Sequence, residues 1–459
     1  MGALGGLRIA IVGAGPSGLA ALRALSAAGF DAVAHERGAR IGGIWTLEER
    51  PTAAYRSLHL ITSRARTEYA ELPMPEGTPD YPARDSVGRY LEGYADRFGL
   101  RERIRLQSEV RRAQRLEGGG WEIELGSGER ERADALVVAN GHNDVAKWPD
   151  PPYPGDFAGE QVHALHYGDA ARFEGRRVVV VGMGNSAMDI ATDISLVAER
   201  TMLSARHGSW VIPKRLLGRP ADQVVKPWVA VHVPWRIRQP LSQTLLRVVV
   251  GPPERYGLPE PSRGLFQDHP TISDTILSRI SHGAIEPKAG IAELAGDRVR
   301  FADGSEEPAD AIVWCTGYSV SIPFLDESLT GADPRELRLY KRVLHLDVED
   351  LFFVGLMQST GSAFPIVESQ AELLASHLSG RWAPPSKARM RADAERRHRR
   401  ALRRWGPHGR PTMRVDFDGH MHELGRELAR GRRRAERGGA RPPLAPRPAV
   451  HATAGAASS

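Results

Sequence analysis

The stretch LRIAIVGAGPSGLAALRALSAAG, residues 7–29, decides the fold. It begins with an apolar run typical of a buried parallel strand, continues into a glycine-rich turn and ends with the spacing of a helix. In the turn, Gly13 allows the tight bend, Gly15 lets the backbone approach a pyrophosphate, and Gly18 brings the helix close to the strand. The start of a helix also offers free N–H groups to an anion. The stretch therefore predicts a dinucleotide-binding unit.

A second strand and an acidic residue complete this unit. The segment FDAVAHE ends at Glu36, which lies 23 residues beyond Gly13. A carboxylate at the end of the second strand can accept hydrogen bonds from ribose hydroxyls. An ordinary glycine-rich turn is the alternative interpretation, but it does not account for the strand, helix and acid that follow in order.

The same unit occurs a second time in residues 176–206. The strand RRVVVV is followed by the turn and helix GMGNSAMDIATDIS, with Gly182, Gly184 and Ala187 at the three turn positions. Arg206 stands where the first unit has its acid. A guanidinium can bind a ribose 2′-phosphate through paired hydrogen bonds, whereas a carboxylate repels it. The first unit therefore suits FAD or NAD and the second NADPH; the alternative is that Arg206 is a solvated surface residue.

Two dinucleotide sites in one chain indicate an oxidoreductase of the α/β class, with two Rossmann-like domains and hydride transfer from a nicotinamide to a flavin. The chain has one cysteine, Cys315. It therefore lacks the dithiol that flavoprotein disulfide reductases need. The reduced flavin would pass its electrons to oxygen, a quinone or a bound substrate.

The composition and charge of the chain narrow its expected partners and location. The 459 residues have 41% apolar content and a net charge of +6, and residues 387–459 hold 19 Lys and Arg against 7 Asp and Glu. Because the excess charge lies in one segment, a nucleic-acid partner is not expected, and the alternative is that this segment binds a polyanion. We find no signal peptide, membrane span or metal-ligand cluster, and we expect a cytoplasmic protein without a metal or membrane partner.

We expect a solvated helix over Lys387–Trp405 and no structure after Gly438, where Pro, Gly and Ala dominate. A basic tail, residues 432–459, is accordingly predicted to be unstructured. Its deletion should leave flavin content and NADPH oxidation unchanged.

The motifs together resemble the class B flavin-dependent monooxygenases, in particular the flavin-containing monooxygenase family, over about residues 7–430. The motifs that carry the resemblance are GAGPSG at 13–18, ERGARIGGIW at 36–45, FAGEQVHALHY at 157–167, GMGNSA at 182–187 and CTGY at 315–318. The resemblance implies an FAD-binding domain interrupted by an NADPH-binding domain. The expected limits are 1–168 and 317–431 for the FAD-binding domain and 169–316 for the NADPH-binding domain.

One of these motifs is similar to the family fingerprint, which Phe157, Gly159, His163 and Tyr167 supply here. Tyrosine at the last position resembles enzymes that oxygenate nitrogen or sulfur, whereas tryptophan would resemble Baeyer-Villiger enzymes. The resemblance leaves two roles open for His163, one at the substrate and one in fixing the link between the domains.

The resemblance also implies which residues bind the cofactors. For FAD they are Gly13, Gly15, Ser17, Gly18, Glu36, Gly43, Trp45 and Gln358, and for NADPH they are Gly182, Gly184, Asn185, Ser186 and Arg206. The alternatives are that Trp45 belongs to the core and that Asn185 and Ser186 cap the helix.

The segment YRSLHLITSRAR departs from the family. Many members have an asparagine near the reactive face of the flavin, where this chain has Ile61. Thr62 or Ser63 is the candidate to replace its hydrogen bond. If neither does so, oxygenation would be weak and NADPH would be oxidised without product.

The reaction that the resemblance implies starts with NADPH reducing FAD. Oxygen then adds at flavin C4a, and the hydroperoxide transfers one oxygen atom to the nitrogen or sulfur of a small molecule. Baeyer-Villiger oxygenation of a ketone, an uncoupled NADPH oxidase and a quinone reductase are the alternatives.

Overall fold

The apolar run of residues 7–12 forms an interior strand of a seven-stranded sheet in the computed structural model, which describes residues 6–268, 270–406, 411–438 and 442–446. Five strands of this sheet are parallel, and two antiparallel strands extend one edge. In order across the sheet they are β23 (Leu339–Tyr340), β24 (Leu344–His345), β25 (Leu351–Phe353), β7 (Ala135–Val138), β1 (Arg8–Val12), β2 (Asp31–His35) and β3 (Ile104–Arg105).

Two layers cover this sheet. Helices α1 (Pro16–Ala27), α3 (Arg84–Arg97) and α10 (Phe364–Leu378) contribute to the apolar core on one face. On the other face lies an antiparallel sheet, which buries Trp121 completely. Its strands are β4 (Val110–Arg115), β5 (Trp121–Leu125) and β6 (Arg130–Ala133).

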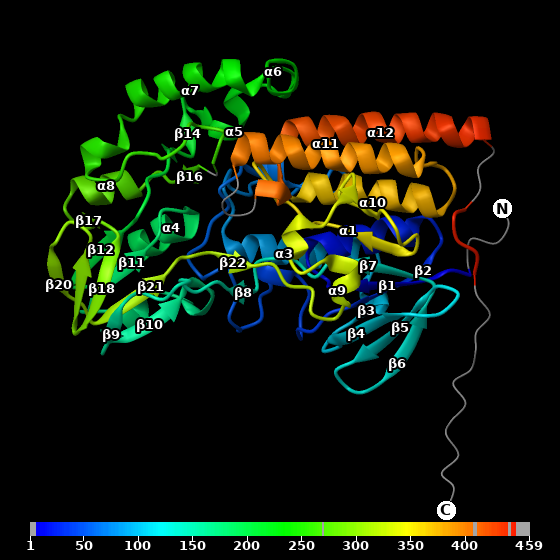
Figure 1. Cartoon of the computed structure of the whole chain (residues 1–459), viewed down its shortest axis with the longest axis horizontal. Coiled ribbons are helices and arrows are strands. Elements are labelled where there is room, and N and C mark those ends of the chain that lie inside the picture. The colour runs from blue at the N-terminus through cyan, green and yellow to red at the C-terminus, as the bar shows by residue number, and fades with distance from the viewer. Residues whose placement is uncertain (1–5, 269, 407–410, 439–441, 447–459) are drawn as a thin grey trace, which may run out of the picture.

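The second glycine unit forms a separate, wholly parallel sheet (Figure 1). In order its strands are β10 (Glu160–His163), β21 (Ala311–Trp314), β11 (Arg177–Val181), β12 (Arg200–Ser204) and β17 (Glu286–Lys288). Helices α4 (Asn185–Ile194) and α8 (Ile276–Ser281) share an apolar core with one face. The four-stranded sheet of β20 (Glu306–Pro308), β19 (Arg298–Phe301), β18 (Ile291–Gly296) and β9 (Gly155–Phe157) packs on the other.

The predicted fold class, α/β with two Rossmann-like units, is confirmed. Strands of the first sheet come from both sides of the second sheet in the sequence, as an inserted domain requires. Strand β10 precedes the predicted boundary at residue 168 but pairs in the second sheet, beside β21. The domain limits stay predictions, since one strand pairing does not define where a domain begins.

Helices α11 (Lys387–Trp405) and α12 (Phe417–Gly438) lie above α10, and α7 (Trp235–Val249) lies near one end of them (Figure 1). The helix predicted over Lys387–Trp405 is therefore confirmed, although one face of it is buried. Short helices are α2 (Arg64–Thr67), α5 (Ala221–Val224), α6 (Pro227–His232) and α9 (Glu327–Thr330). Short strand pairs are β13 (Val211–Ile212) with β16 (Thr271–Ile272), β14 (Arg215–Leu216) with β15 (Arg219–Pro220), β8 (Val145–Ala146) with β22 (Tyr318–Ser319), and β26 (Gln358–Ser359) with β27 (Arg414–Val415).

None of the helices in the described ranges is long and apolar enough to cross a membrane.

The prediction of an unstructured tail from residue 432 is wrong for residues 432–438, which continue α12. The reason is packing against Trp382, whose indole N–H donates to the carbonyl of Glu427 at 3.0 Å. A Cβ on Gly431 would lie 1.7 Å from that indole nitrogen, so the glycine permits the close approach. Residues 439–441 and 447–459 of the predicted tail lie outside the described residues.

Truncation separates these two parts of the tail. A chain that ends at Gly431 loses Arg434, which pairs with the buried Glu427 and donates to the carbonyl of Ala383 at 2.9 Å. We expect this chain to be less stable by about 2 kcal/mol, because it leaves the Glu427 carboxylate buried without its cation. Thermal unfolding should shift down by a few degrees, whereas a control chain that ends at Pro446 should unfold like the full chain. Equal stability of both truncations would restore the prediction of a dispensable tail.

Candidate active site

The turn between β1 and α1 has no room for side chains. Gly13 has a φ of +103°, and a Cβ there would lie 2.7 Å from the carbonyl oxygen of Ala139. A Cβ on Gly18 would lie 1.8 Å from the carbonyl oxygen of Gly13. Gly15 is the N-cap of α1, and no side chain caps this helix end. The first N–H groups of α1 are thus available for a pyrophosphate.

Glu36 closes the turn from the end of β2. Its buried carboxylate accepts hydrogen bonds from the backbone N–H groups of Ala14 and Gly38, both at 2.9 Å. Further lone pairs remain for ribose hydroxyls. Glu36, Gly13 and Asn140 line a cavity of about 150 Å³. Sequence reasoning foresaw the acid at this position but missed that it also holds the turn in shape.

The remaining residues predicted to bind FAD surround the same turn. A Cβ on Gly43 would lie 2.9 Å from the Cα of Gly15, so the 3₁₀ turn of residues 43–45 packs directly on the glycine loop. Trp45 is half-buried and also contacts the core, as the alternative interpretation held. Ser17 lies under the turn after β25, because a Cβ on Gly355 would meet its Oγ at 2.1 Å.

Gln358 lies further from the glycine loop in sequence, on the short strand β26. Its Oε1 accepts a hydrogen bond of 3.3 Å from Nε of Arg414, which lies on the paired strand β27. Gln358 is half-buried. Its contact with a flavin ring stays a prediction.

The turn between β11 and α4 repeats the geometry of the first unit. Gly182 has a φ of +136°, and a Cβ there would lie 2.7 Å from the carbonyl oxygen of Cys315. Gly184 is the N-cap of α4, again with no side chain capping the helix. A Cβ on Gly184 would meet no described atom within 4 Å, so the space above this helix end is open to a phosphate.

Asn185 and Ser186, on the first turn of α4, do not cap the helix, and that alternative is wrong. Asn185 Oδ1 instead accepts a 2.7 Å hydrogen bond from the backbone N–H of Ile272. Asn185 therefore holds strand β16 beside the N-terminal end of α4, a contact that the sequence pattern did not indicate.

A cavity of about 490 Å³ extends from this second turn. Arg206 and His207 line it together with Gly182, Trp148 and Thr316. Arg206 is exposed and forms no ion pair with any carboxylate in the described part of the chain. Its guanidinium is therefore available for an anion in the cavity, as a 2′-phosphate site requires.

Three residues of the family fingerprint pack within the second unit. Phe157 packs against the core of the second sheet, and a Cβ on Gly159 would lie 2.5 Å from the carbonyl oxygen of Asp310. Tyr167 is buried, and its hydroxyl donates to Asp193 on α4 at 2.7 Å. These contacts are structural. None of the three residues lines either of the two nucleotide cavities.

His163 is buried at the end of β10, where its Nδ1 accepts a hydrogen bond from the N–H of Leu165 at 3.1 Å. Loss of water lowers the pKa of His163. Its ring lies 5.6 Å from the rings of both Trp148 and Tyr318. Trp148 follows β8 and Tyr318 begins β22, and these paired strands lie on the two chain segments that run between the sheets. This placement favours the linking role of His163 over a role at the substrate.

Residues 55–57 of the first unit are hydrogen-bonded to α4 of the second. The hydroxyl of Tyr55 donates to Asp189 at 2.9 Å, and that of Ser57 to Asp193 at 2.7 Å. Burial raises the pKa of both Tyr55 and Asp189. Sequence reasoning missed this junction, because the partners are close in space but more than 130 residues apart in the sequence.

The polar side chains of the segment expected near the reactive face of the flavin are already hydrogen-bonded within the protein. Thr62 shares a 2.8 Å hydrogen bond with Thr67. Ser63 is buried, its Oγ accepts from Gln223 at 2.9 Å, and its N–H donates to Asp222 at 2.7 Å. Ile61 is half-buried. Helix α5 thus supplies polar side chains that the sequence pattern did not indicate.

A family model described as flavin-binding monooxygenase-like matches residues 6–431. The chain belongs to this family. It is a flavoprotein monooxygenase whose cofactors are FAD and NADPH. The glycine turns, the buried Glu36 and the exposed Arg206 fit these two groups.

Curated relatives cover most of the chain. Flavin-containing monooxygenase 2 of Homo sapiens is 31% identical over 449 residues, which are 92% of this chain and 82% of that protein. Dimethylaniline monooxygenase [N-oxide-forming] 2 of Rattus norvegicus is 32% identical over 447 residues, with the same coverage.

Solved structures share the fold. S-allyl-L-cysteine S-oxygenase of Allium sativum has a TM-score of 0.67 at 24% identity and covers 94% of this chain and 91% of its own. Cyclohexanone monooxygenase bound to ε-caprolactone has a TM-score of 0.71 at 18% identity, with coverages of 93% and 98%.

Proposed function

We propose that this monooxygenase uses NADPH and O2 to transfer one oxygen atom to the nitrogen or sulfur of a small molecule. The observation that carries the use of NADPH beside FAD is the opposite charge at equivalent places of the two units, Glu36 in the first and Arg206 in the second. An acid suits the unphosphorylated ribose of FAD, and a cation suits the 2′-phosphate of NADPH.

The protein contributes binding and orientation. FAD, when bound, accepts hydride from NADPH and supplies the chemistry that activates oxygen. The N–H groups at the starts of α1 and α4 would hold the two pyrophosphates. The hydrogen bonds from Tyr55 and Ser57 to α4 join the two units, which would hold the two cofactor sites in one arrangement.

Two features support nitrogen or sulfur as the acceptor. The fingerprint ends in Tyr167, where Baeyer-Villiger enzymes would have tryptophan, and a relative with 32% identity is named for N-oxide formation. Baeyer-Villiger oxygenation is the second candidate, since the cyclohexanone enzyme shares the fold.

Rapid mixing tests the proposal. The enzyme is reduced anaerobically with NADPH and mixed with oxygenated buffer, and the flavin absorbance is followed with and without N,N-dimethylaniline, a thioether or a cyclic ketone. We expect a transient species before the oxidised spectrum returns, and N-oxide or sulfoxide formed in step with NADPH. Peroxide release that no substrate reduces would contradict the proposal and indicate an oxidase. Oxidation of the ketone alone would indicate the second candidate.

We also propose a cytoplasmic location, supported by the single cysteine of the chain, Cys315. Fractionation of cells with an antibody to the protein tests this; recovery in the membrane pellet would contradict it.

A further inference from the structure

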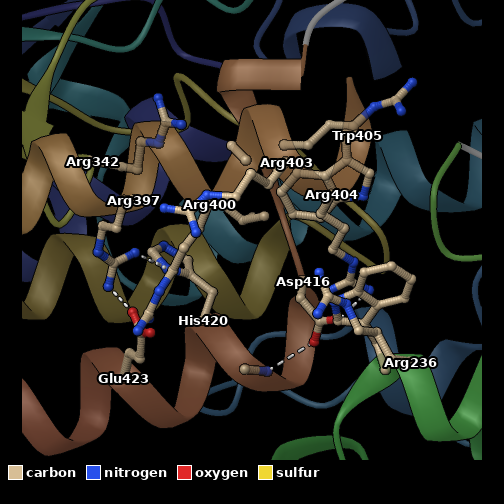
Figure 2. A pocket seen from close by; sticks show the side chains of 15 residues that line it. Arg236, Arg342, Arg397, Arg400, Arg403, Arg404, Trp405, Asp416, His420 and Glu423 are labelled. Carbon is tan, nitrogen blue, oxygen red and sulfur yellow. Dashed lines mark hydrogen bonds and ion pairs between the residues drawn. The ribbon is translucent and has the colours of Figure 1, made fainter. Parts of the chain in front are cut away.

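A cavity of about 390 Å³ lies where α11, α12, strand β27 and the start of α7 meet (Figure 2). None of its lining residues belongs to the predicted cofactor sites. Its lining is strongly basic, with only Asp416 and Glu423 as carboxylates. The arginines that line it are Arg236, Arg342, Arg397, Arg400, Arg403, Arg404 and Arg414.

The two carboxylates are already engaged. Asp416 accepts a 2.9 Å hydrogen bond from Arg404, and Glu423 contacts the guanidinium of Arg397 (Figure 2). Arg414 pairs with Asp268 outside the cavity at 3.0 Å. The other four arginines of the cavity form no ion pair with another residue in the described ranges; they are Arg236, Arg342, Arg400 and Arg403. The cavity therefore keeps an uncompensated positive charge.

Arg342 is the most constrained of these four. It follows Lys341 in a loop where both residues have positive φ, +53° and +63°. Loss of water contact and the nearby Arg397 lower the pKa of Arg342 to about 10. A guanidinium that has been taken out of water is stabilised by an anion beside it.

His420 and Trp405 add two buried donors. Nδ1 of His420 lies 3.4 Å from a guanidinium nitrogen of Arg397, and a guanidinium can only donate. Nδ1 must then accept, which places the proton of the neutral ring on Nε2. This Nε2 and the indole nitrogen of Trp405 are buried and have no hydrogen-bond partner among the described residues. Both unpartnered groups are donors, so a ligand that only accepts would fit them.

We propose that this cavity binds a small organic phosphate that carries at least two negative charges. Phosphate oxygens accept hydrogen bonds from several directions and match the paired N–H groups of arginine. The volume suits a small molecule rather than a polymer. Trp235 and Trp405 also line the cavity, with the Arg404 guanidinium 5.4 and 4.9 Å from their rings. The cavity shares no lining residue with either dinucleotide cavity, and Arg414 joins it to Gln358 of the predicted flavin site.

Calorimetric titration with inorganic pyrophosphate tests the proposal. The holoenzyme is used with FAD bound and NADP⁺ at saturation, so that both dinucleotide sites are filled. We expect one further site per chain, and we expect Arg342→Gln and Arg400→Ala each to weaken its Kd by about tenfold or more. Arg399→Ala is the matched control, because Arg399 is the neighbouring exposed arginine of α11, does not line the cavity and pairs with Glu395.

The outcomes of this titration distinguish a phosphate site from the alternatives. If Arg342→Gln does not fold, the exposed Arg400→Ala and Arg403→Ala variants carry the comparison with Arg399→Ala. No binding up to about 10 mM pyrophosphate, or an equal loss in Arg399→Ala, overturns the proposal. Citrate binding without pyrophosphate binding overturns the assignment of phosphate. Binding of single-stranded DNA or heparin alone would also overturn it, in favour of a macromolecular polyanion.

Discussion

Protein that carries Gly18→Ala should be purified without flavin. The added Cβ would lie 1.8 Å from the carbonyl oxygen of Gly13, a distance that no pair of atoms tolerates without bonding. Helix α1 would have to move away from β1, and the N–H groups of its first turn would leave the pyrophosphate position. We expect flavin content, measured from the absorbance of the purified protein, to fall below about one tenth of the unsubstituted value, with a loss of stability of about 3 kcal/mol.

Gly93→Ala is the control for adding a methyl group to a glycine in a helix. Gly93 is exposed within α3, and a Cβ there would meet no described atom within 4 Å. It should keep its flavin and gain up to about 1 kcal/mol, because alanine is the better helix former. Full flavin content in Gly18→Ala would show that α1 can shift without losing the cofactor, and would remove the close approach as a requirement.

The second unit shows why the prediction is specific to the first. It has Ala187 at the position equivalent to Gly18, and that alanine is buried on α4. A Cβ on Gly182 would still lie 3.4 Å from the Cβ of Ala187. The second turn therefore has room for a methyl group between strand and helix, whereas the first does not.

Local patterns predicted the nucleotide units correctly because their determinants are adjacent in sequence. An apolar run of five or six residues, a glycine turn and a helix are each short-range features, and β1, α1, β11 and α4 all lie where the sequence placed them. The positions of Glu36 after β2 and Arg206 after β12 were also predicted correctly, since each follows its glycine turn by a fixed length of chain. Their contacts with the cofactors stay predictions.

Contacts between distant residues could not be predicted in the same way. Nothing near Ser63 in the sequence indicates that Asp222 and Gln223 meet it, and nothing near Tyr55 indicates Asp189. In each case the partner comes from the other unit, and only the packing of the two sheets brings the pair together.

The end of α12 was mispredicted for a different reason. Composition there is dominated by arginine and glycine, which is typical of a disordered tail. A weaker signal was present, since Leu424, Glu427, Gly431 and Ala435 recur every three or four residues and are all buried. On the buried face of α12, Gly431 and Glu427 occupy positions where apolar residues are usual. They do so because the bulky indole of Trp382 packs against this face of the helix.

Arg206→Ala should weaken the reaction with NADPH far more than the reaction with NADH. The guanidinium lines the second cavity at the end of β12 and has no carboxylate partner among the described residues, so its charge is free for the 2′-phosphate. NADH lacks that phosphate. A hydrogen bond between charged groups contributes about 1.5–3 kcal/mol. We therefore expect kcat/KM for the nicotinamide cofactor to fall about 10- to 100-fold with NADPH and less than about twofold with NADH.

Two further variants identify the interaction behind that loss. Arg206→Lys keeps the charge but not the paired N–H groups, so part of the NADPH preference should return. His207→Ala removes the neighbouring side chain in the same cavity and should have a smaller effect if Arg206 is the main contact. Equal losses with NADPH and NADH would mean that Arg206 acts on the shape of the cavity. That reading has a physical basis, because its side chain packs on Gly290, where a Cβ would lie 2.7 Å from Arg206 Cγ.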